Sequence, residues 1–442
     1  MSGPGLRRIL GVGDGLAVGV GLVIGVGILR TPGLIAGYLG GAWPILLAWV
    51  AGGVIALLSA MVFSEMAAMY PEAGGKFAYA RQAFGPLGGF VAGWSEVIVT
   101  RGGFPAASKA IVIGEYLILL TGWGAIRGWA AVVVLGYFLL HLMGLQAGRV
   151  FQSVVTAAKV VLILVIIGAG LIGGTGASWA PGATMTPERG LLLGFALAYL
   201  SVSFTYYGWD DAIKMAEEIR EPGRLLPRIL VLGAVAVAGL YLAINVAFLS
   251  ALSPAQMSGS PLVAADAVAV AFGESGRTFI TVTALVILLS SLNVNFLSVP
   301  RVVYGLARRG LAPAGFVRVS GGGTPLGGLV LITALIFLLA MTRSFEFLIQ
   351  FMMFVAISVD AMVLIALFRL RAVRPLEPRP YRVPGYPWMP VIVVILHLMI
   401  LVLVAVTQPK LALGASALLA ALLAAGVIWS RTKADSVRKA AH

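Results

Sequence analysis

The chain contains no cysteine, only three histidines and few charged side chains. Without cysteine it can form neither a disulfide framework nor a thiolate metal site. The histidines lie far apart in the sequence, so we expect no metal centre. Charged residues make up 11% of the chain, against about 25% in average soluble domains. Phosphate-binding loops, nucleophile elbows and zinc-protease motifs are missing, so we expect neither an enzyme nor a cofactor.

Hydrophobic residues are abundant, at 60% of 442 residues. A bilayer core about 30 Å thick is crossed by roughly 20 apolar residues in a helix, and apolar runs of this length recur along the chain. The sequence therefore predicts an all-α integral membrane protein in the lipid bilayer. The hydropathy pattern predicts twelve transmembrane helices, at roughly 14–38, 42–66, 87–120, 128–146, 151–174, 190–215, 229–252, 277–305, 326–342, 345–369, 388–407 and 411–430.

The net charge of +14 raises the question of a nucleic-acid partner, but the basic residues sit in short connections between apolar runs. Of the 31 Lys and Arg residues, 22 fall on the side that holds both termini and five on the other, while four lie inside apolar runs. Cationic loops stay in the cytoplasm. The distribution predicts a multi-pass protein of the cytoplasmic membrane with both termini cytoplasmic, and no nucleic acid.

Glycines crowd the first predicted span, where Gly25 and Gly27 are followed by Pro32. Each glycine costs about 1 kcal/mol in a helix interior. Small residues also allow close helix packing, but two glycines only two positions apart face different directions. A mid-membrane break explains the pair better. Such a break frees N–H groups that suit a carboxylate and C=O groups that suit an ammonium, and an amino acid carries both.

The sixth span repeats this pattern, because Gly208 lies among aromatic residues and precedes two acids, Asp210 and Asp211. Spans one and six hold matching positions in two halves of five helices. Interrupted segments at matching positions of two halves are the best sequence indication of a transporter site. We therefore predict one half at 1–174, a second, oppositely oriented half at 190–370, and a linker with two further helices and a tail at 371–442.

Several ionisable side chains lie inside apolar runs, where they are costly and so become functional hypotheses. Lys159 in the fifth span could couple transport to protons or replace a bound sodium, or it could snorkel to the interface. Arg30 and Arg101 could each pair with an acid such as Glu96 or Asp210, or contact an anionic substrate.

Five motifs in order resemble the amino acid–polyamine–organocation permeases, and among them the L-type exchangers, from about Gly11 to Pro390. They are Gly25-Val26-Gly27-Ile28, Pro71-Glu72-Ala73-Gly74-Gly75, Tyr207-Gly208-Trp209-Asp210 with Ala216-Glu217-Glu218-Ile219, Pro300 to Arg308, and Arg379 to Pro387. The resemblance implies a LeuT-like inverted five-plus-five fold with two extra helices, and alternating access to a site between unwound helices one and six.

The resemblance and the residue patterns together give one set of candidate residues. Substrate binding is expected at Ile24, Gly25, Val26, Gly27, Ile28, Phe204, Thr205, Tyr206, Tyr207, Gly208 and Trp209. The segment Gly25 to Ile28 should hold the α-carboxylate, and carbonyls near Phe204 to Tyr207, with Ile24, the amino group. The resemblance implies that Phe204 is the gate and that Lys159, Ser290 and Ser291 serve coupling.

The predicted function is sodium-independent amino acid transport, by proton symport or exchange. The expected partners are an amino acid, protons and lipid. A polyamine or organocation transporter and a transport-inactive amino acid sensor remain alternatives. A channel fits the glycine breaks less well, and an intramembrane enzyme would need a nucleophile–base pair or a metal cluster. The oligomeric state is not predicted.

Overall fold

The computed structural model describes residues 11–23, 25–71, 75–143, 149–174, 176–179, 184, 190–210, 213, 216, 219–320 and 323–440. Within these ranges the chain is helical and forms no β-strand. The predicted contacts of Ile24 and of the loop residues 72–74 lie outside the described residues.

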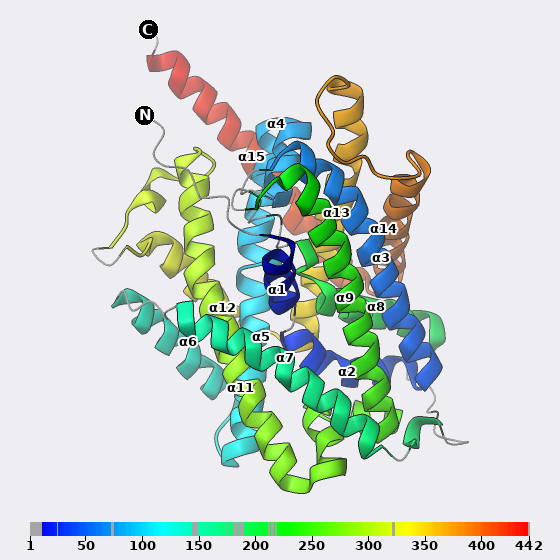
Figure 1. Ribbon diagram of the computed structural model, residues 1–442. Coiled ribbons are helices and arrows are strands. Elements are labelled where there is room, and N and C mark those ends of the chain that lie inside the picture. The colour runs from blue at the N-terminus through cyan, green and yellow to red at the C-terminus, as the bar shows by residue number, and fades with distance from the viewer. Residues whose placement is uncertain are drawn as a thin grey trace.

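The helices follow one another with short connections (Figure 1). Their bounds are α1 Val12–Val23, α2 Val26–Leu39, α3 Ala42–Met69, α4 Gly75–Ser95, α5 Gly103–Thr121, α6 Ile126–Leu142, α7 Arg149–Ile172, α8 Leu191–Tyr206, α9 Pro222–Ala251, α10 Pro254–Ser258, α11 Val263–Arg308, α12 Leu326–Thr342, α13 Phe345–Val373, α14 Trp388–Thr407 and α15 Pro409–Ala440. A π-helical turn, η1, spans Glu96–Thr100, and short 3-10 turns lie at Ala177–Trp179 (η2) and Ala314–Val317 (η4).

Seven helical segments of the described chain are long and apolar enough to cross a membrane. They are Ala42–Met69, Gly75–Thr121, Pro222–Ala251, Val263–Arg308, Phe345–Val373, Trp388–Thr407 and Pro409–Thr432. Shorter apolar helices occur at Val26–Leu39, Ile126–Leu142, Val161–Ile172, Leu192–Tyr206 and Leu326–Thr342. The all-helical membrane class agrees with the sequence, while twelve crossings remain a prediction because these five helices are short.

Two predicted spans belong to helical segments with breaks that the sequence did not predict. The span predicted as one helix at 87–120 is interrupted: α4 passes into η1, a bend follows at Arg101–Gly102, and α5 begins at Gly103. The span predicted at 277–305 belongs to the longer α11, which includes a non-helical residue at Gly273 (φ 63°). Hydropathy missed both features because it averages over about 19 residues and does not register a break of one or two residues.

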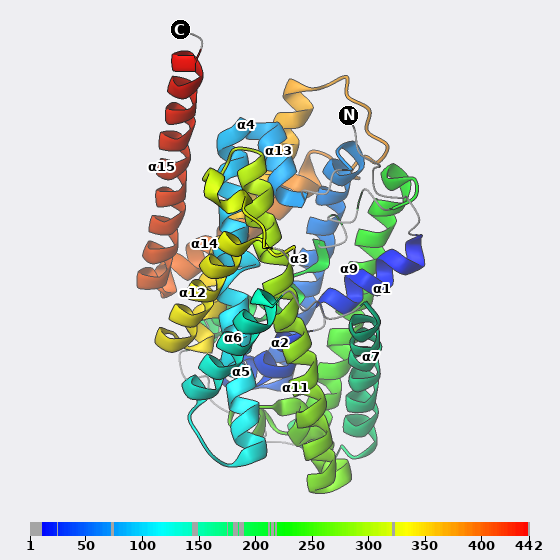
Figure 2. The same cartoon turned by 90° about the vertical axis from the view of Figure 1, so that its left-hand side faces the viewer.

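Burial separates the central helices from the peripheral ones. In an apolar window of 18 residues, 78% of α13 is buried inside the protein, against 28% of the same window in α14 and in α15. Figure 2 shows α14 and α15 at one side of the bundle and α1, α7 and α9 at the other. Since an apolar helix surface that is not covered by protein suits lipid, α14 and α15 are peripheral helices, and α13 lies in the core.

A linker joins α13 to α14 and folds back onto the end of α3, on the side of the molecule where α15 ends (Figure 1). Its anchor is Glu65, which is fully buried. Glu65 accepts two bonds from the Arg371 guanidinium, at 2.9 and 2.6 Å, and one from the Val383 amide at 2.8 Å. Arg379 lies 3.4 Å from the same carboxylate. The arginine-rich linker motif thus fixes the connection to the bundle.

Candidate functional site

The first helix interruption separates α1 from α2. Gly25 is extended (φ −154°, ψ −152°) and makes no side-chain cap to α2. The first N–H groups of a helix have no partner within it, so those at the start of α2 face Gly25 without a capping side chain. Gly27 packs directly on α8, where a Cβ would lie 2.7 Å from the Thr205 Cα atom. A glycine at 27 is therefore required by the approach of the two helices.

The second interruption follows α8. The helix ends at Tyr206, and Gly208 has a φ of 127°, a conformation that residues with a Cβ rarely adopt. A short 3-10 segment begins at Trp209 and Asp210. No α-helix is seen in the described part of the chain between Tyr206 and Pro222. Both interruptions thus occur where the sequence predicts them.

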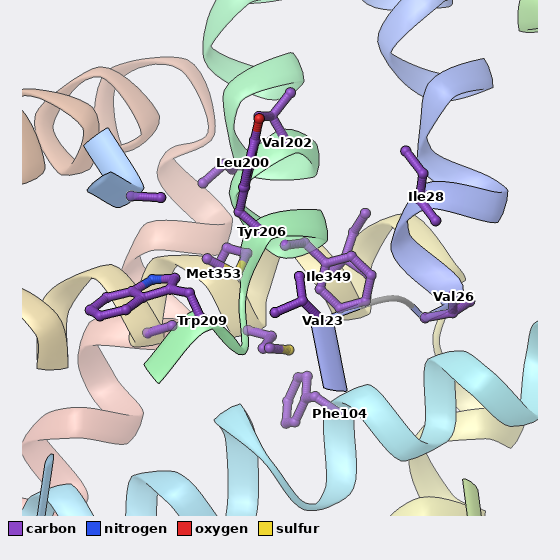
Figure 3. Packing of buried hydrophobic residues seen from close by; sticks show 14 of the residues in the cluster. Val23, Val26, Ile28, Phe104, Leu200, Val202, Tyr206, Trp209, Ile349 and Met353 are labelled. Carbon is purple, nitrogen blue, oxygen red and sulfur yellow. The ribbon is translucent and has the colours of Figure 1, made fainter. Parts of the chain in front are cut away.

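Polar contacts join the two interruptions. The hydroxyl groups of Thr31 on α2 and Thr205 on α8 are 2.8 Å apart. The Tyr241 hydroxyl, from α9, lies 3.0 Å from the Val23 carbonyl and 3.2 Å from the Thr205 carbonyl, and donates toward both. Val23 is the last residue of α1, so one buried phenol satisfies carbonyl groups at both breaks. In Figure 3 the end of α8 and the start of α2 lie near each other, with α5 passing beside them at Phe104.

A cavity of about 340 Å³ lies at these interruptions, within the size range of small-molecule sites. Residues of α1, α2, η1, α5, α7, α8, α11 and α13 contribute to its wall. The lining residues are Val23, Gly25, Val26, Gly27, Glu96, Thr100, Arg101, Pro105, Lys109, Lys159, Phe204, Thr205, Tyr207, Ser291, Val294, Asn295, Ser298, Val299, Val302 and Met352.

Many of the predicted site residues line this cavity. They are Gly25, Val26, Gly27, Lys159, Phe204, Thr205, Tyr207 and Ser291. The ring of Phe204 meets Phe345 edge to face, with centroids 6.2 Å apart. Lys159, on α7, is 4% exposed, so it is not a lysine that extends to the surface.

Other predicted residues lie away from the cavity. Ile28 is fully buried, and Ser290 is 2% exposed. The Tyr206 hydroxyl donates to the Trp49 carbonyl at 3.1 Å, and Trp209 packs edge to face on Phe63. None of these residues lines the 340 Å³ cavity, and neither does Gly208.

The interruption at Arg101–Gly102 brings further polar groups to the cavity that the predicted binding set omits. Arg101 and Lys109 both line it, eight residues apart. The Lys109 ammonium donates to the Asn295 side-chain oxygen at 2.7 Å and to the Ser291 carbonyl at 3.3 Å. The Asn295 amide nitrogen in turn donates to the Arg101 carbonyl at 2.6 Å. The adjacent glycines 102 and 103 were the available sequence signal for this break.

A buried ionic network holds the chain after α8. The Arg101 guanidinium lies 2.9 Å from Asp210, and the Lys76 ammonium lies 3.2 Å from Asp210 and 2.6 Å from Asp360. Lys76 and Arg101 also lie over the ring of Tyr207, 4.6 and 4.9 Å from its centroid. These ion pairs therefore join α4, the bend before α5, α13 and the segment after α8 through two cations and two carboxylates.

Both intramembrane arginines form ion pairs, as the salt-bridge hypothesis predicts, and one of the two acids was not named from the sequence. Arg101 pairs with Asp210, an acid named from the sequence. Arg30 instead pairs with Glu115 of α5, at 3.0 Å. The sequence gave no indication of this partner, because the two residues are 85 positions apart.

A second cavity of about 620 Å³ adjoins the first, since Glu96 and Val302 line both. Arg301, Arg308 and Arg309, at the end of α11, also line it. Three arginines therefore line this adjoining cavity, at the end of α11 that lies on the same side of the molecule as the α13–α14 linker (Figure 1).

Known proteins resemble this chain over most of its length. A family model described as amino acid permease matches residues 10–428. The chain belongs to the amino acid permease family. The serine/threonine exchanger SteT of Bacillus subtilis (strain 168) is 28% identical over 399 residues, which cover 88% of this chain and 89% of the exchanger.

Two further relatives extend the range of named substrates. The b(0,+)-type amino acid transporter 1 of Mus musculus is 25% identical over 388 residues, covering 83% of this chain and 76% of the transporter. The glutamate/serine transporter AimA of Bacillus subtilis (strain 168) is 27% identical over 250 residues, covering 50% of this chain and 46% of the transporter.

Proposed function

We propose that this permease is a secondary active transporter that moves amino acids across the cytoplasmic membrane by alternating access, without sodium. The observation that carries the proposal is one cavity lined by residues of both interruptions, Gly25 and Gly27 on one side and Phe204 and Thr205 on the other. The relatives named as amino acid exchangers and transporters support the same conclusion.

The α-carboxylate binds the uncapped N–H groups at the start of α2. Gly25 supplies no side-chain cap, and the positive end of a helix dipole favours an anion. The amino group binds carbonyl oxygens at the ends of α1 and α8. Tyr241 already donates toward the Val23 and Thr205 carbonyls, and each carbonyl oxygen has two lone pairs, so each can also accept from an ammonium.

Lys159 acts as the coupling group. Its side chain is buried and lines the same cavity as Gly25 and Ser291. A fixed ammonium at this place takes the role of a bound cation, or exchanges a proton as the cavity changes sides. Phe204 closes over the bound substrate as a gate.

The wider arrangement that we propose is twelve transmembrane helices, with an inverted pair of five-helix halves at 1–174 and 190–370 and two peripheral helices in 371–442. Both termini lie in the cytoplasm. The strong excess of Lys and Arg on one side of the predicted topology supports this orientation.

The test is uptake of each radiolabelled amino acid, and of polyamines, into proteoliposomes at two pH values with and without sodium. We expect saturable, sodium-independent amino acid uptake that is accelerated either by internal amino acid or by an inward proton gradient. Saturable binding without uptake would indicate a sensor, and polyamine uptake alone would reject the substrate class.

A Lys159→Ala variant tests the coupling role. We expect uptake to fall at least tenfold, the equivalent of about 1.4 kcal/mol, while the protein elutes as the wild type does in gel filtration. The exposed Lys410→Ala variant is the control. Full uptake with unchanged pH dependence in Lys159→Ala would remove Lys159 from the mechanism.

A further inference from the structure

The cavity carries two chemically different sets of binding groups. The interruptions at Gly25 and after Tyr206 contribute main-chain groups, which any α-amino acid can use. The other set comes from α5 and α11 and consists of side chains. Ser291, Asn295 and Ser298 are spaced four and three residues apart, so they share one face of α11 and all line the cavity. This second set is available to recognise a substrate's side chain.

Lys109 is held in a defined position within this set. Its ammonium donates to the side-chain oxygen of Asn295, whose amide nitrogen donates to the Arg101 carbonyl. Both bonds fix the orientation of the Asn295 amide, which is 8% exposed. The buried Asn295 amide is hydrogen-bonded through both its oxygen and its nitrogen, so it holds the Lys109 ammonium in a preorganised position. Preorganisation lowers the ordering cost of binding a ligand.

The charges that line the cavity are mostly positive. Among the described lining residues, Arg101, Lys109 and Lys159 are basic and only Glu96 is acidic. Among the described residues, Arg101 belongs to a network with Asp210, Lys76 and Asp360, which contains two cations and two carboxylates.

Outside that network, these lining residues carry two formal positive charges against one negative charge. An amino acid with a neutral side chain adds no net charge, a basic one raises the excess, and an acidic one cancels it. Charge interactions are strong in a poorly hydrated membrane interior, so the described part of the cavity wall complements an acidic amino acid.

The charge of the adjoining cavity has the same sign. The adjoining 620 Å³ cavity is lined by Arg301, Arg308 and Arg309 together with Glu96. A cleft lined by charge of one sign raises the local concentration of ligands of the opposite sign.

We infer that the substrate class is the acidic amino acids, with the side-chain carboxylate bound by Lys109 and Asn295 acting as the residue that positions it. This inference rests on the proposed transport function and names its substrate.

The test compares L-glutamate with its uncharged analogue L-glutamine, in binding to the purified full-length protein and in uptake by proteoliposomes. We expect the wild type to bind glutamate at least about tenfold more tightly, the range of a hydrogen bond to a charged group. Lys109→Met keeps the chain length but removes the ammonium. It should weaken glutamate binding about 10- to 100-fold and change glutamine binding less than about threefold.

Two further variants complete the design. Asn295→Asp should also abolish the preference, because its carboxylate occupies the Lys109 ammonium, and this holds even if Lys109→Met fails to fold. Lys410→Met, at an exposed position on α15, is the matched control and should retain the wild-type ratio.

Failure of the acidic substrate class and failure of the proposed transport function give different results. Equal binding of glutamate and glutamine by the wild type, or an equal loss of both in Lys109→Met, overturns the acidic substrate class and leaves amino acid transport standing. A preference for arginine or lysine also overturns it and assigns recognition to Glu96. Absence of binding and uptake for every amino acid overturns the proposed function itself.

Discussion

The two helix interruptions that the sequence predicts are stabilised by different means. At the first, between α1 and α2, glycine permits a close approach: Gly25 is extended and Gly27 touches the backbone of Thr205. At the second, after α8, distant charged side chains hold the segment, through Lys76, Arg101 and Asp360 around Asp210. The first break therefore depends on local backbone freedom and close packing, and the second on tertiary ion pairs.

This difference implies different consequences of mutation. A break made by glycine is sensitive to added volume, whereas one held by buried charges is sensitive to the loss of a single partner. Removing one member of a buried ion pair costs about 3–5 kcal/mol, because the other charge stays buried.

The largest effect is expected from Lys76→Met. It leaves Asp210 and Asp360 close together without the ammonium that lies between them, and should lower the unfolding free energy by about 3–5 kcal/mol. Unfolding in detergent measures this. Hydrogen exchange should rise around Tyr206 to Asp210 and not around Val26 to Ile28, which separates the two interruptions.

The double variant Lys76→Met/Asp360→Asn should recover part of the loss, because one uncompensated carboxylate is removed. Lys410→Met, which is exposed, is the control. If Lys76→Met unfolds like the wild type, the network does not hold the second interruption.

A smaller effect is expected from Gly27→Ala. The new Cβ would lie 2.7 Å from the Thr205 Cα atom, so α2 and α8 must separate at a cost of about 1–3 kcal/mol. Substrate affinity should fall correspondingly, as measured by ligand-dependent thermal shift. Gly239→Ala, where a Cβ meets no atom within 4 Å, is the matched control. Wild-type affinity in Gly27→Ala would contradict a site at this contact.

Tyr241→Phe acts on both interruptions at once. It removes the hydroxyl that donates toward the Val23 and Thr205 carbonyls, a loss of about 1 kcal/mol in stability. Hydrogen exchange should rise at both breaks to a similar extent. An increase at only one break would show that the hydrogen bond to the carbonyl at the other break does not contribute to stability.

The smallest effect is expected in the linker between α13 and α14, none of whose residues lines the 340 Å³ cavity. The Tyr70 hydroxyl bonds to Glu377 and, with Arg374, holds the pKa of that carboxyl below its usual value. A lowered carboxyl pKa stabilises the folded state above the unfolded pKa, and the contribution disappears as pH falls below about 4.5 through the folded pKa. Glu377→Gln should cost at most about 1 kcal/mol.

Its measurement is the pH dependence of thermal unfolding between pH 3 and 7, expected to be slightly flatter in Glu377→Gln than in the wild type. Substrate affinity should not change. Altered affinity would mean that the linker is energetically coupled to the cavity, and that the two interruptions do not respond to mutation independently.

Much of the first interruption could be predicted from sequence, because its causes are local. The pair Gly25 and Gly27 indicated a break, and α1 ends at Val23 while α2 begins at Val26. The break at Arg101–Gly102 was missed, although glycines 102 and 103 are adjacent, because the apolar run around them looks continuous to a hydropathy window. Aromatic residues near Gly208 were expected at the substrate, yet Tyr206 and Trp209 pack on other rings.

The sequence by itself determined the membrane class, the family and the positions of both predicted interruptions, because apolar run length and glycine content act within a few residues of chain. Only the tertiary structure decided which polar groups meet: Arg30 with Glu115 and Arg101 with Asp210 as ion pairs, and Lys109 with Asn295 as a hydrogen bond. These partners are separated by 85 to 186 residues. The physical reason is that ion pairs and buried hydrogen bonds depend on distance in space, which helix packing sets and local sequence does not encode.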